Sequence, residues 1–228
     1  MAKLEKAAAK ASKAHIRYKD KGGNIVPGVT TILGIINKPA LVKWANNLGL
    51  QGYDSSAYVD ETARIGTLAH EMIQEHLGGS AVEYGAYTKD QINAAENSLL
   101  SYYEWERRQN SGKIETIYIE LPLVSEIHKF GGTIDWYGKI GDDYWLIDIK
   151  TAKGLYPEHE MQVSAYFSML IENGYKVDGV RLLRVGRSED EGFDDHVLSD
   201  ARLSQGWEVF KCALDLYRAK QKFEKGEK

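Results

Sequence analysis

Cysteine is almost absent from this sequence, since Cys212 is the only one among 228 residues. A single cysteine excludes an internal disulfide, a cysteine-based structural zinc site and an iron–sulfur cluster, because each of these needs several thiols. Cys212 lies within an apolar helical pattern, Trp-Glu-Val-Phe-Lys-Cys-Ala-Leu-Asp-Leu-Tyr. This position favours a buried, inert thiol over a nucleophile.

Long hydrophobic runs are missing as well. No apolar stretch approaches the roughly 20 residues that span a bilayer, and the longest, near Ile32–Ile36, is interrupted by Gly34. The first residues lack the apolar segment of a secretory signal, and no Gly-x-x-x-x-Gly-Lys-Ser/Thr loop occurs. We therefore expect a cytoplasmic protein with no membrane partner and no helicase motor of its own.

An excess of basic charge is also lacking, since the formal net charge is −4. Positive charges gather near the two ends, in residues 3–21 and 218–228. Such tails can contact phosphate groups, although solubilising ends are an equal alternative. We interpret residues 1–22 as a basic, flexible arm and residues 23–228 as a single domain. Its first part, 23–110, is expected to be mainly helical, and 111–228 to hold the sheet.

Hydrophobic periodicity predicts the order of the helices and strands. Helices are expected over residues 39–49, 60–77, 88–108, 158–172 and 201–219. Strands are expected over residues 114–121, 130–140, 144–150, 180–185 and 196–198. This order predicts an α/β fold in which a central mixed β-sheet is flanked by helices, with an N-terminal helical region.

The segment from Asp135 to Lys150 places chemically active side chains at one end of a predicted hairpin. Side chains alternate along a strand, so Asp148 and Lys150 share one face, while Ile147 and Ile149 can anchor the other face in the core. The hairpin pairs Asp135 roughly with Asp148. Two adjacent carboxylates attract a hard divalent cation, and a lysine can neutralise charge, position a water or stabilise an oxyanion. Phosphodiester hydrolysis needs this combination, whereas a surface ion pair is the ordinary alternative.

Two helices contribute further candidates. Gln162 and Tyr166 are four residues apart and share one helix face, where they can contact a phosphate, a base or a neighbouring ligand. The alternative is a core tyrosine beside a solvated glutamine. His70 lies one turn after Gly66. A glycine inside a helix costs about 1 kcal/mol of stability relative to alanine, and the expected benefit is the close approach of another backbone or of substrate. A lone helical histidine is more often structural than a metal ligand.

In this order, Gly66-Thr67-Leu68-Ala69-His70, Asp135, Asp148-Ile149-Lys150 and Gln162-x-x-x-Tyr166 resemble the PD-(D/E)xK nuclease superfamily in its RecB-type branch. Residues 26–49, with Pro27-Gly28-Val29-Thr30 and a helix containing Trp44, are similar to the N-terminal region of phage exonucleases and of the mitochondrial genome maintenance exonuclease. The resemblance spans residues 25–170 and implies a restriction-endonuclease-like nuclease core.

The resemblance implies a role for each matching residue. The ligands of a Mg²⁺ or Mn²⁺ ion would be His70, Asp135, Asp148 and the backbone carbonyl of Ile149. Lys150 would position or activate the water beside the catalytic carboxylates. Gln162 and Tyr166 would organise the site and contact DNA. Glu120 occupies a strand position where some relatives hold another acidic group, with a solvated strand residue as an equal alternative.

The implied function is a metal-dependent DNA exonuclease that acts on single-stranded DNA or DNA ends in phage-type replication, repair or recombination. Single-stranded-DNA-binding or recombination proteins are the partners that such a role implies. In the exonucleases it resembles, helices from this N-terminal region arch over the active site and admit a threaded strand, which predicts a requirement for a free end. The alternatives are a structure-specific or nicking endonuclease and a catalytically inactive nuclease fold that binds DNA. The complete set of metal and lysine positions argues against the inactive form.

Overall fold

The computed structural model describes residues 16–109 and 113–226, so the lysines predicted to form most of the basic arm lie outside the described residues. The helices are α1 (Val29–Leu33), α2 (Pro39–Leu50), α3 (Ser55–His76), α4 (Lys89–Arg107), α5 (Pro157–Glu172) and α6 (Asp200–Lys225). The strands are β1 (Ile114–Ser125), β2 (Phe130–Ile140), β3 (Asp143–Lys150), β4 (Gly179–Val185) and β5 (Phe193–Val197). A short 3-10 helix, η1 (Tyr84–Ala86), precedes α4.

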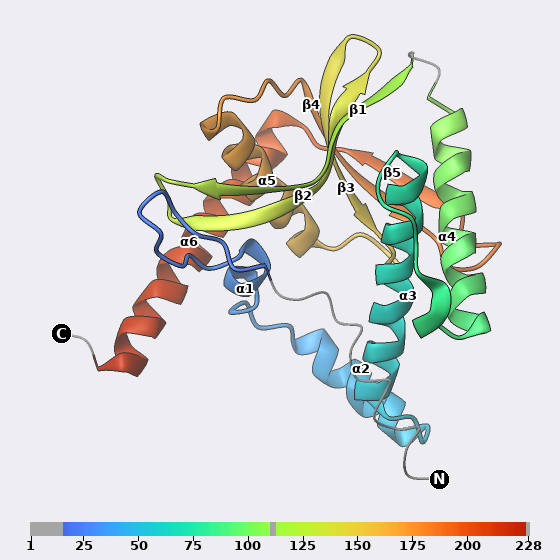
Figure 1. The fold of residues 1–228 in the computed structure, drawn as a ribbon. Helices are drawn as coiled ribbons and strands as arrows, with labels where there is room; N and C mark the ends of the chain where they lie inside the picture. Colours follow the sequence, from blue (N-terminus) through green and yellow to red (C-terminus); the bar gives the residue numbers. More distant parts are fainter. Residues whose placement is uncertain (1–15, 110–112, 227–228) are drawn as a thin grey trace.

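Five strands form one mixed sheet in the order β1-β2-β3-β4-β5 (Figure 1). The first three strands pair antiparallel, and β2 and β3 form the predicted hairpin. Strands β3 and β4 are parallel, so the chain crosses from one to the other through α5. Strand β5 then pairs antiparallel with β4. The expected α/β fold with a mixed central sheet is confirmed.

Helices cover both faces of the sheet (Figure 1). On one face, α1, α5 and α6 bury strand residues such as Phe130, Ile134 and Leu146. On the other, α3 and α4 bury Trp136 and Ile147. The central strands β2, β3 and β4 are therefore largely buried on both sides, which is typical of a sheet enclosed by helices. Helix α2 has no buried residue and projects from this body with the start of α3.

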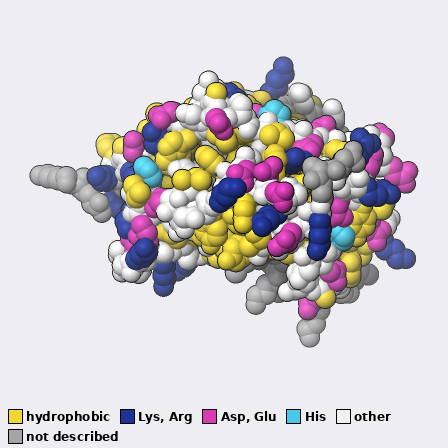
Figure 2. Space-filling view, turned by 90° about the horizontal axis from the view of Figure 1, so that it is seen from above, with side chains coloured by type: hydrophobic (Ala, Val, Ile, Leu, Met, Phe, Trp, Pro, Cys, Tyr) yellow, Lys and Arg dark blue, Asp and Glu magenta, His cyan; other side chains and the backbone are white. Residues whose placement is uncertain are grey.

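The surface carries mixed charge rather than a single sign where it is seen from above. There, Lys and Arg side chains are interspersed with Asp and Glu among apolar groups (Figure 2). This mixture agrees with the net charge of −4. Within residues 16–109 and 113–226, no helix combines the length and the apolarity needed to cross a bilayer.

Side-chain caps explain where two helices begin. At the start of α4, Thr88 and Gln91 form a capping box: each side chain accepts a hydrogen bond from the backbone N–H of the other. Helix α3 begins at Ser55 rather than at residue 60, because the Asp54 carboxylate accepts hydrogen bonds from two backbone N–H groups of the first turn. The longer α3 extends beyond the region of His70 toward α2.

One helix boundary and one prediction about a single residue are wrong. Helix α2, expected over residues 39–49, continues to Leu50, and Gln51 is its C-cap. Cys212 is exposed rather than buried. The buried face of α6 consists of Leu203, Gly206, Phe210, Ala213 and Leu214. These residues recur three or four apart, and Cys212 falls outside that spacing.

Residues 16–28 pack against the beginning of β2. The N–H of Gly131 donates a hydrogen bond to the Pro27 carbonyl. The Tyr18 ring occupies the space above Gly131, where an added Cβ would lie 2.3 Å from Tyr18 Cγ. Its hydroxyl is hydrogen bonded to Thr133 Oγ1 at 2.9 Å. An added Cβ at Gly28 would lie 3.2 Å from Cε2 of the same tyrosine ring. The described end of the predicted arm is therefore attached to the sheet.

Candidate active site

A chain of polar contacts links the end of β3 to α5. The Lys150 ammonium lies 2.7 Å from Asp148 Oδ2 and donates a hydrogen bond to Gln162 Oε1 at 2.9 Å. Gln162 Nε2 in turn donates to the Tyr166 hydroxyl at 2.9 Å. The alternation of β3 aligns Asp148 with Lys150, and the four-residue spacing in α5 aligns Gln162 with Tyr166. The packing of α5 beside the end of β3 then joins the two pairs.

Asp148 is an ionisable group in an unfavourable environment. Burial raises its pKa to about 6, although the Lys150 ammonium acts to lower it, and the Asp135 carboxylate raises it further. Both carboxylate oxygens are buried without a hydrogen-bond partner among the described residues. The contact with Lys150 is an ion pair by distance, but it lacks the angles of a hydrogen bond. Such a carboxylate is costly unless further positive charge compensates it.

The protonation states of Lys150 and Tyr166 follow from the same charges. Burial acts to lower the pKa of Lys150, but Asp148 and Asp135 more than offset it, so the pKa is raised and the ammonium stays charged. Burial, reinforced by Asp148, raises the pKa of Tyr166 well above its usual value and keeps the hydroxyl neutral. Because Tyr166 is only 4% exposed, its ring is not available to stack on a base.

Asp135 and His70 approach the same point from β2 and α3. The Ile149 N–H donates a hydrogen bond to Asp135 Oδ2 at 2.8 Å. The same oxygen lies 3.9 Å from His70 Nδ1. The register that pairs Trp136 with Ile147 accounts for this arrangement, because the next residues along the two strands are Asp135 and Asp148.

Gly66 has the close neighbour that its position inside α3 suggested. An added Cβ would lie 2.8 Å from Thr151 Oγ1. Thr151 directly follows Lys150, so the missing side chain lets α3 approach the end of β3. The neighbour is a protein side chain rather than another backbone.

Most of the candidate residues line one open hollow of about 460 Å³. Its wall includes His70, Asp135, Ile149, Lys150 and Glu120, together with residues of α3 and the two residues after Lys150. The buried Asp148 is not among its lining residues. The hollow therefore presents a histidine, two carboxylates and a lysine to the surface.

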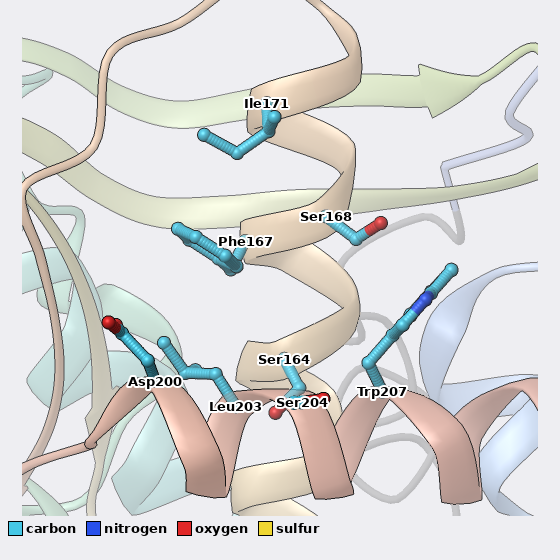
Figure 3. Close-up of a pocket in the computed structure, with 8 residues that line it drawn as sticks. All are labelled: Ser164, Phe167, Ser168, Ile171, Asp200, Leu203, Ser204 and Trp207. Carbon is cyan, nitrogen blue, oxygen red and sulfur yellow. The ribbon is translucent and has the colours of Figure 1, made fainter.

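A second hollow, of about 420 Å³, lies between α5 and α6 (Figure 3). Its walls carry Phe167 and Ile171 from α5 and Leu203 and Trp207 from α6, with serines between them. Among its lining residues only Asp200 is ionisable. Because hydrolytic chemistry needs converging charged or nucleophilic groups, the hollow beside His70 is the better candidate.

The donor groups at the hollow fit a divalent cation in kind. Carboxylate oxygens and a backbone carbonyl suit Mg²⁺ and Mn²⁺, and an imidazole is acceptable to Mn²⁺. The two buried Asp148 oxygens without hydrogen bonds are the feature that a cation would compensate. As they stand, no three His, Cys, Asp or Glu side chains of the described part of the chain are close enough together to hold a metal ion. Lys150 is the positive group paired with Asp148 in this conformation.

Sequence reasoning missed two neighbours of the site, Gln74 and Thr151. Gln74 Nε2 donates a hydrogen bond to Glu120 Oε1 at 2.6 Å. Its position four residues after His70 on one helix face was a usable signal. Thr151 lines the hollow and lies against Gly66. The only signal for this contact in the sequence was the glycine inside a helix.

Comparison with known proteins gives limited likenesses. No family model matches the chain, and no curated protein matches it. A protein from Eubacterium rectale, described as a candidate exonuclease, is 12% identical over 72% of this chain and 69% of that one, with a TM-score of 0.48.

The alkaline exonuclease LHK-Exo from Laribacter hongkongensis is also similar in structure. It is 14% identical over 68% of this chain and 83% of its own, with a TM-score of 0.32. Its complex with dAMP is 15% identical over 71% and 84%, with a TM-score of 0.34. TM-scores below 0.5 do not establish a shared activity, so we infer the function from the geometry of the site.

Proposed function

We propose that this chain is a divalent-metal-dependent nuclease that hydrolyses DNA phosphodiester bonds. The observation that carries the proposal is Asp148, a buried carboxylate whose oxygens have no hydrogen-bond partner and whose ion-pair partner is Lys150. Structural ion pairs are normally completed by hydrogen bonds, whereas a metal-binding carboxylate leaves its oxygens for the cation. Asp135 and His70, 3.9 Å apart, supply further donors beside it.

Each residue has a distinct part in this proposal. Asp135, Asp148, His70 and the Ile149 carbonyl would hold Mg²⁺ or Mn²⁺. When bound, such a cation supplies Lewis-acid activation of the attacking water and neutralises charge on the phosphoryl group. Lys150 keeps its proton, so its ammonium can stabilise negative charge as it develops on a phosphoryl oxygen.

Gln162 and Tyr166 act on Lys150 rather than on the substrate. The Gln162 carbonyl fixes the direction of the ammonium, and the Tyr166 hydroxyl holds Gln162 in turn. This chain pre-orients the charge before the substrate binds, which is where most electrostatic stabilisation in enzymes originates.

The hollow beside His70, about 460 Å³ and open to the surface, has room for a small ligand such as one nucleotide unit. The resemblance of residues 26–49 to phage exonucleases is what implies a single-stranded substrate with a free end. Of the N-terminal helices, α3 forms one wall of the hollow. Helix α2 contacts α3 where Trp44 packs edge-on against Tyr58 at a centroid distance of 5.7 Å.

Digestion of defined substrates tests the proposal. Linear single strands, linear duplexes and closed circular single strands, each labelled, are incubated with Mg²⁺, with Mn²⁺ or with a chelator. We expect metal-dependent loss of the linear single strand and survival of the circle. Equal degradation of the circle would replace the exonuclease by an endonuclease. Binding without degradation under any metal would mean an inactive DNA-binding module.

A matched pair of variants ties the activity to the site. Asp148→Asn should lower turnover by orders of magnitude, because it removes a carboxylate from the metal site. Asp215→Asn makes the same chemical change on α6, where the side chain is 80% exposed, and should behave as the parent protein. Full activity of Asp148→Asn would contradict the assignment of the site.

A further inference from the structure

Glu120 has a backbone conformation that is unusual for its place in a strand. Its φ is +50°, although it is neither a glycine nor in a turn, and its neighbours Ile119 and Leu121 pair with Trp136 and Ile134. It therefore lies opposite Asp135 in the β1–β2 ladder. Non-glycine residues adopt this left-handed region rarely, and such strain persists where the surrounding structure enforces it.

The strain coincides with a change of side in both strands. Ile119 packs with the α3–α4 layer, whereas Leu121 packs with the α1–α5–α6 layer. On β2, Trp136 and Ile134 divide between the same two layers. Residues two apart in a regular strand share one face, so the alternation breaks at Glu120 and Asp135. The break turns both carboxylates toward the hollow that His70 lines.

The Glu120 carboxylate is held by the helix that carries His70. Gln74 Nε2 donates to Glu120 Oε1 at 2.6 Å, and Gln74 lies one helical turn after His70 on α3. Glu120 also forms the wall between the site and a neighbouring hollow lined by Glu71, Gln74 and Glu83. The contact therefore joins β1 to α3 directly beside the site.

We propose that Glu120 is a positioning residue whose hydrogen bond to Gln74 clamps α3 to β1 and thereby fixes His70 relative to Asp135. The effect of Glu120 on function rests on the proposed metal site, whereas the contact between Glu120 and Gln74 does not depend on it. Second-sphere contacts of this kind set the orientation of metal ligands, and their loss commonly lowers metal affinity by about 10-fold or more.

A swap of the two partners separates the clamp from a simple effect of charge. Glu120→Ala removes the acceptor, and Gln74→Glu places two carboxylates against each other. The double variant Gln74→Glu with Glu120→Gln restores a donor and an acceptor in exchanged positions. Glu83→Gln is the control, because it removes a carboxylate from the neighbouring hollow without touching Gln74.

Two readouts are measured without DNA: Mn²⁺ affinity by calorimetry, and hydrogen exchange of the α3 amides near His70. Glu120→Ala and Gln74→Glu should each lose about 10-fold in affinity and exchange about five-fold faster, and the double variant should recover both. Unchanged exchange in Glu120→Ala, or no recovery in the double variant, would overturn the clamp. If the parent protein binds no Mn²⁺, the proposed metal site fails, while hydrogen exchange still decides the clamp.

Discussion

Ionisation of Asp148 should make the stability of the metal-free protein fall as the pH rises. Its pKa is raised from the usual 3.8 to about 6 by burial. A raised folded-state pKa means that the neutral acid is favoured in the folded protein. The group's contribution to stability is therefore fully present below about pH 4 and is lost as the pH rises through about 6. A shift of about two units corresponds to about 3 kcal/mol of unfolding free energy.

Urea unfolding in a chelator measures this directly. The parent protein and Asp148→Asn are compared between about pH 4 and about pH 7, and their difference cancels the titration of most other groups. Asparagine has nearly the same shape but does not ionise. We expect the parent to lose about 3 kcal/mol relative to the variant over this range.

Excess Mg²⁺ or Mn²⁺ should reverse the loss in the parent protein alone. A ligand at about 100 times its dissociation constant stabilises the folded state by about 2.7 kcal/mol. The recovery should be largest above pH 6, where Asp148 is ionised. A stability difference between the two proteins that does not change with pH would refute the reasoning, because it would mean that Asp148 titrates alike in the folded and unfolded chains.

Three further predictions concern the neighbours of Asp148. Lys150→Ala should retain Mn²⁺ affinity but lose about 10²–10³ in turnover. His70→Ala should instead weaken Mn²⁺ binding by about 10-fold or more; calorimetry compares the two, and equal losses of affinity would contradict their separate roles. Gly66→Ala should lower both stability and activity, since its Cβ would meet Thr151 Oγ1 at 2.8 Å, and the loss should shrink in a Thr151→Ala background. The control Gly49→Ala, in open space on α2, should stabilise the protein by up to about 1 kcal/mol in thermal unfolding.

Features fixed by neighbouring residues were predictable from the sequence. Strand β2 runs from Phe130 to Ile140 as expected, because its ends are set by flanking turn residues. The expected helix over 88–108 begins at Lys89, because Thr88 and Gln91, three residues apart, form a capping box. Two-residue alternation placed Lys150 beside Asp148 on β3, and four-residue spacing placed Gln162 beside Tyr166 on α5, since each pair follows from local geometry. The contact between Lys150 and Gln162 joins two elements, so local spacing did not predict it.

Features that depend on distant packing were not predictable. The φ of Glu120 reflects a bend that two strands make together against two helical layers, and a single strand pattern does not contain it. The exposure of Cys212 depends on which side of α6 faces the core. The apolar residues around Cys212 fit two different helix faces, so the sequence does not decide between them. The burial of the Asp148 oxygens without hydrogen-bond partners likewise depends on the packing around β3, which the strand's own pattern does not contain.

The adjacent glycines of β2 should leave a trace in the natural variation of related sequences. An added Cβ at Gly131 would strike Tyr18, and one at Gly132 would lie 2.5 Å from Tyr166 Cε1. The two positions are therefore constrained by different partners, one in the N-terminal segment and one beside Gln162 on α5. A larger residue at 131 should accompany loss of the aromatic ring at 18, whereas a larger residue at 132 should accompany a smaller one at 166. Two neighbouring positions of one strand should thus co-vary independently.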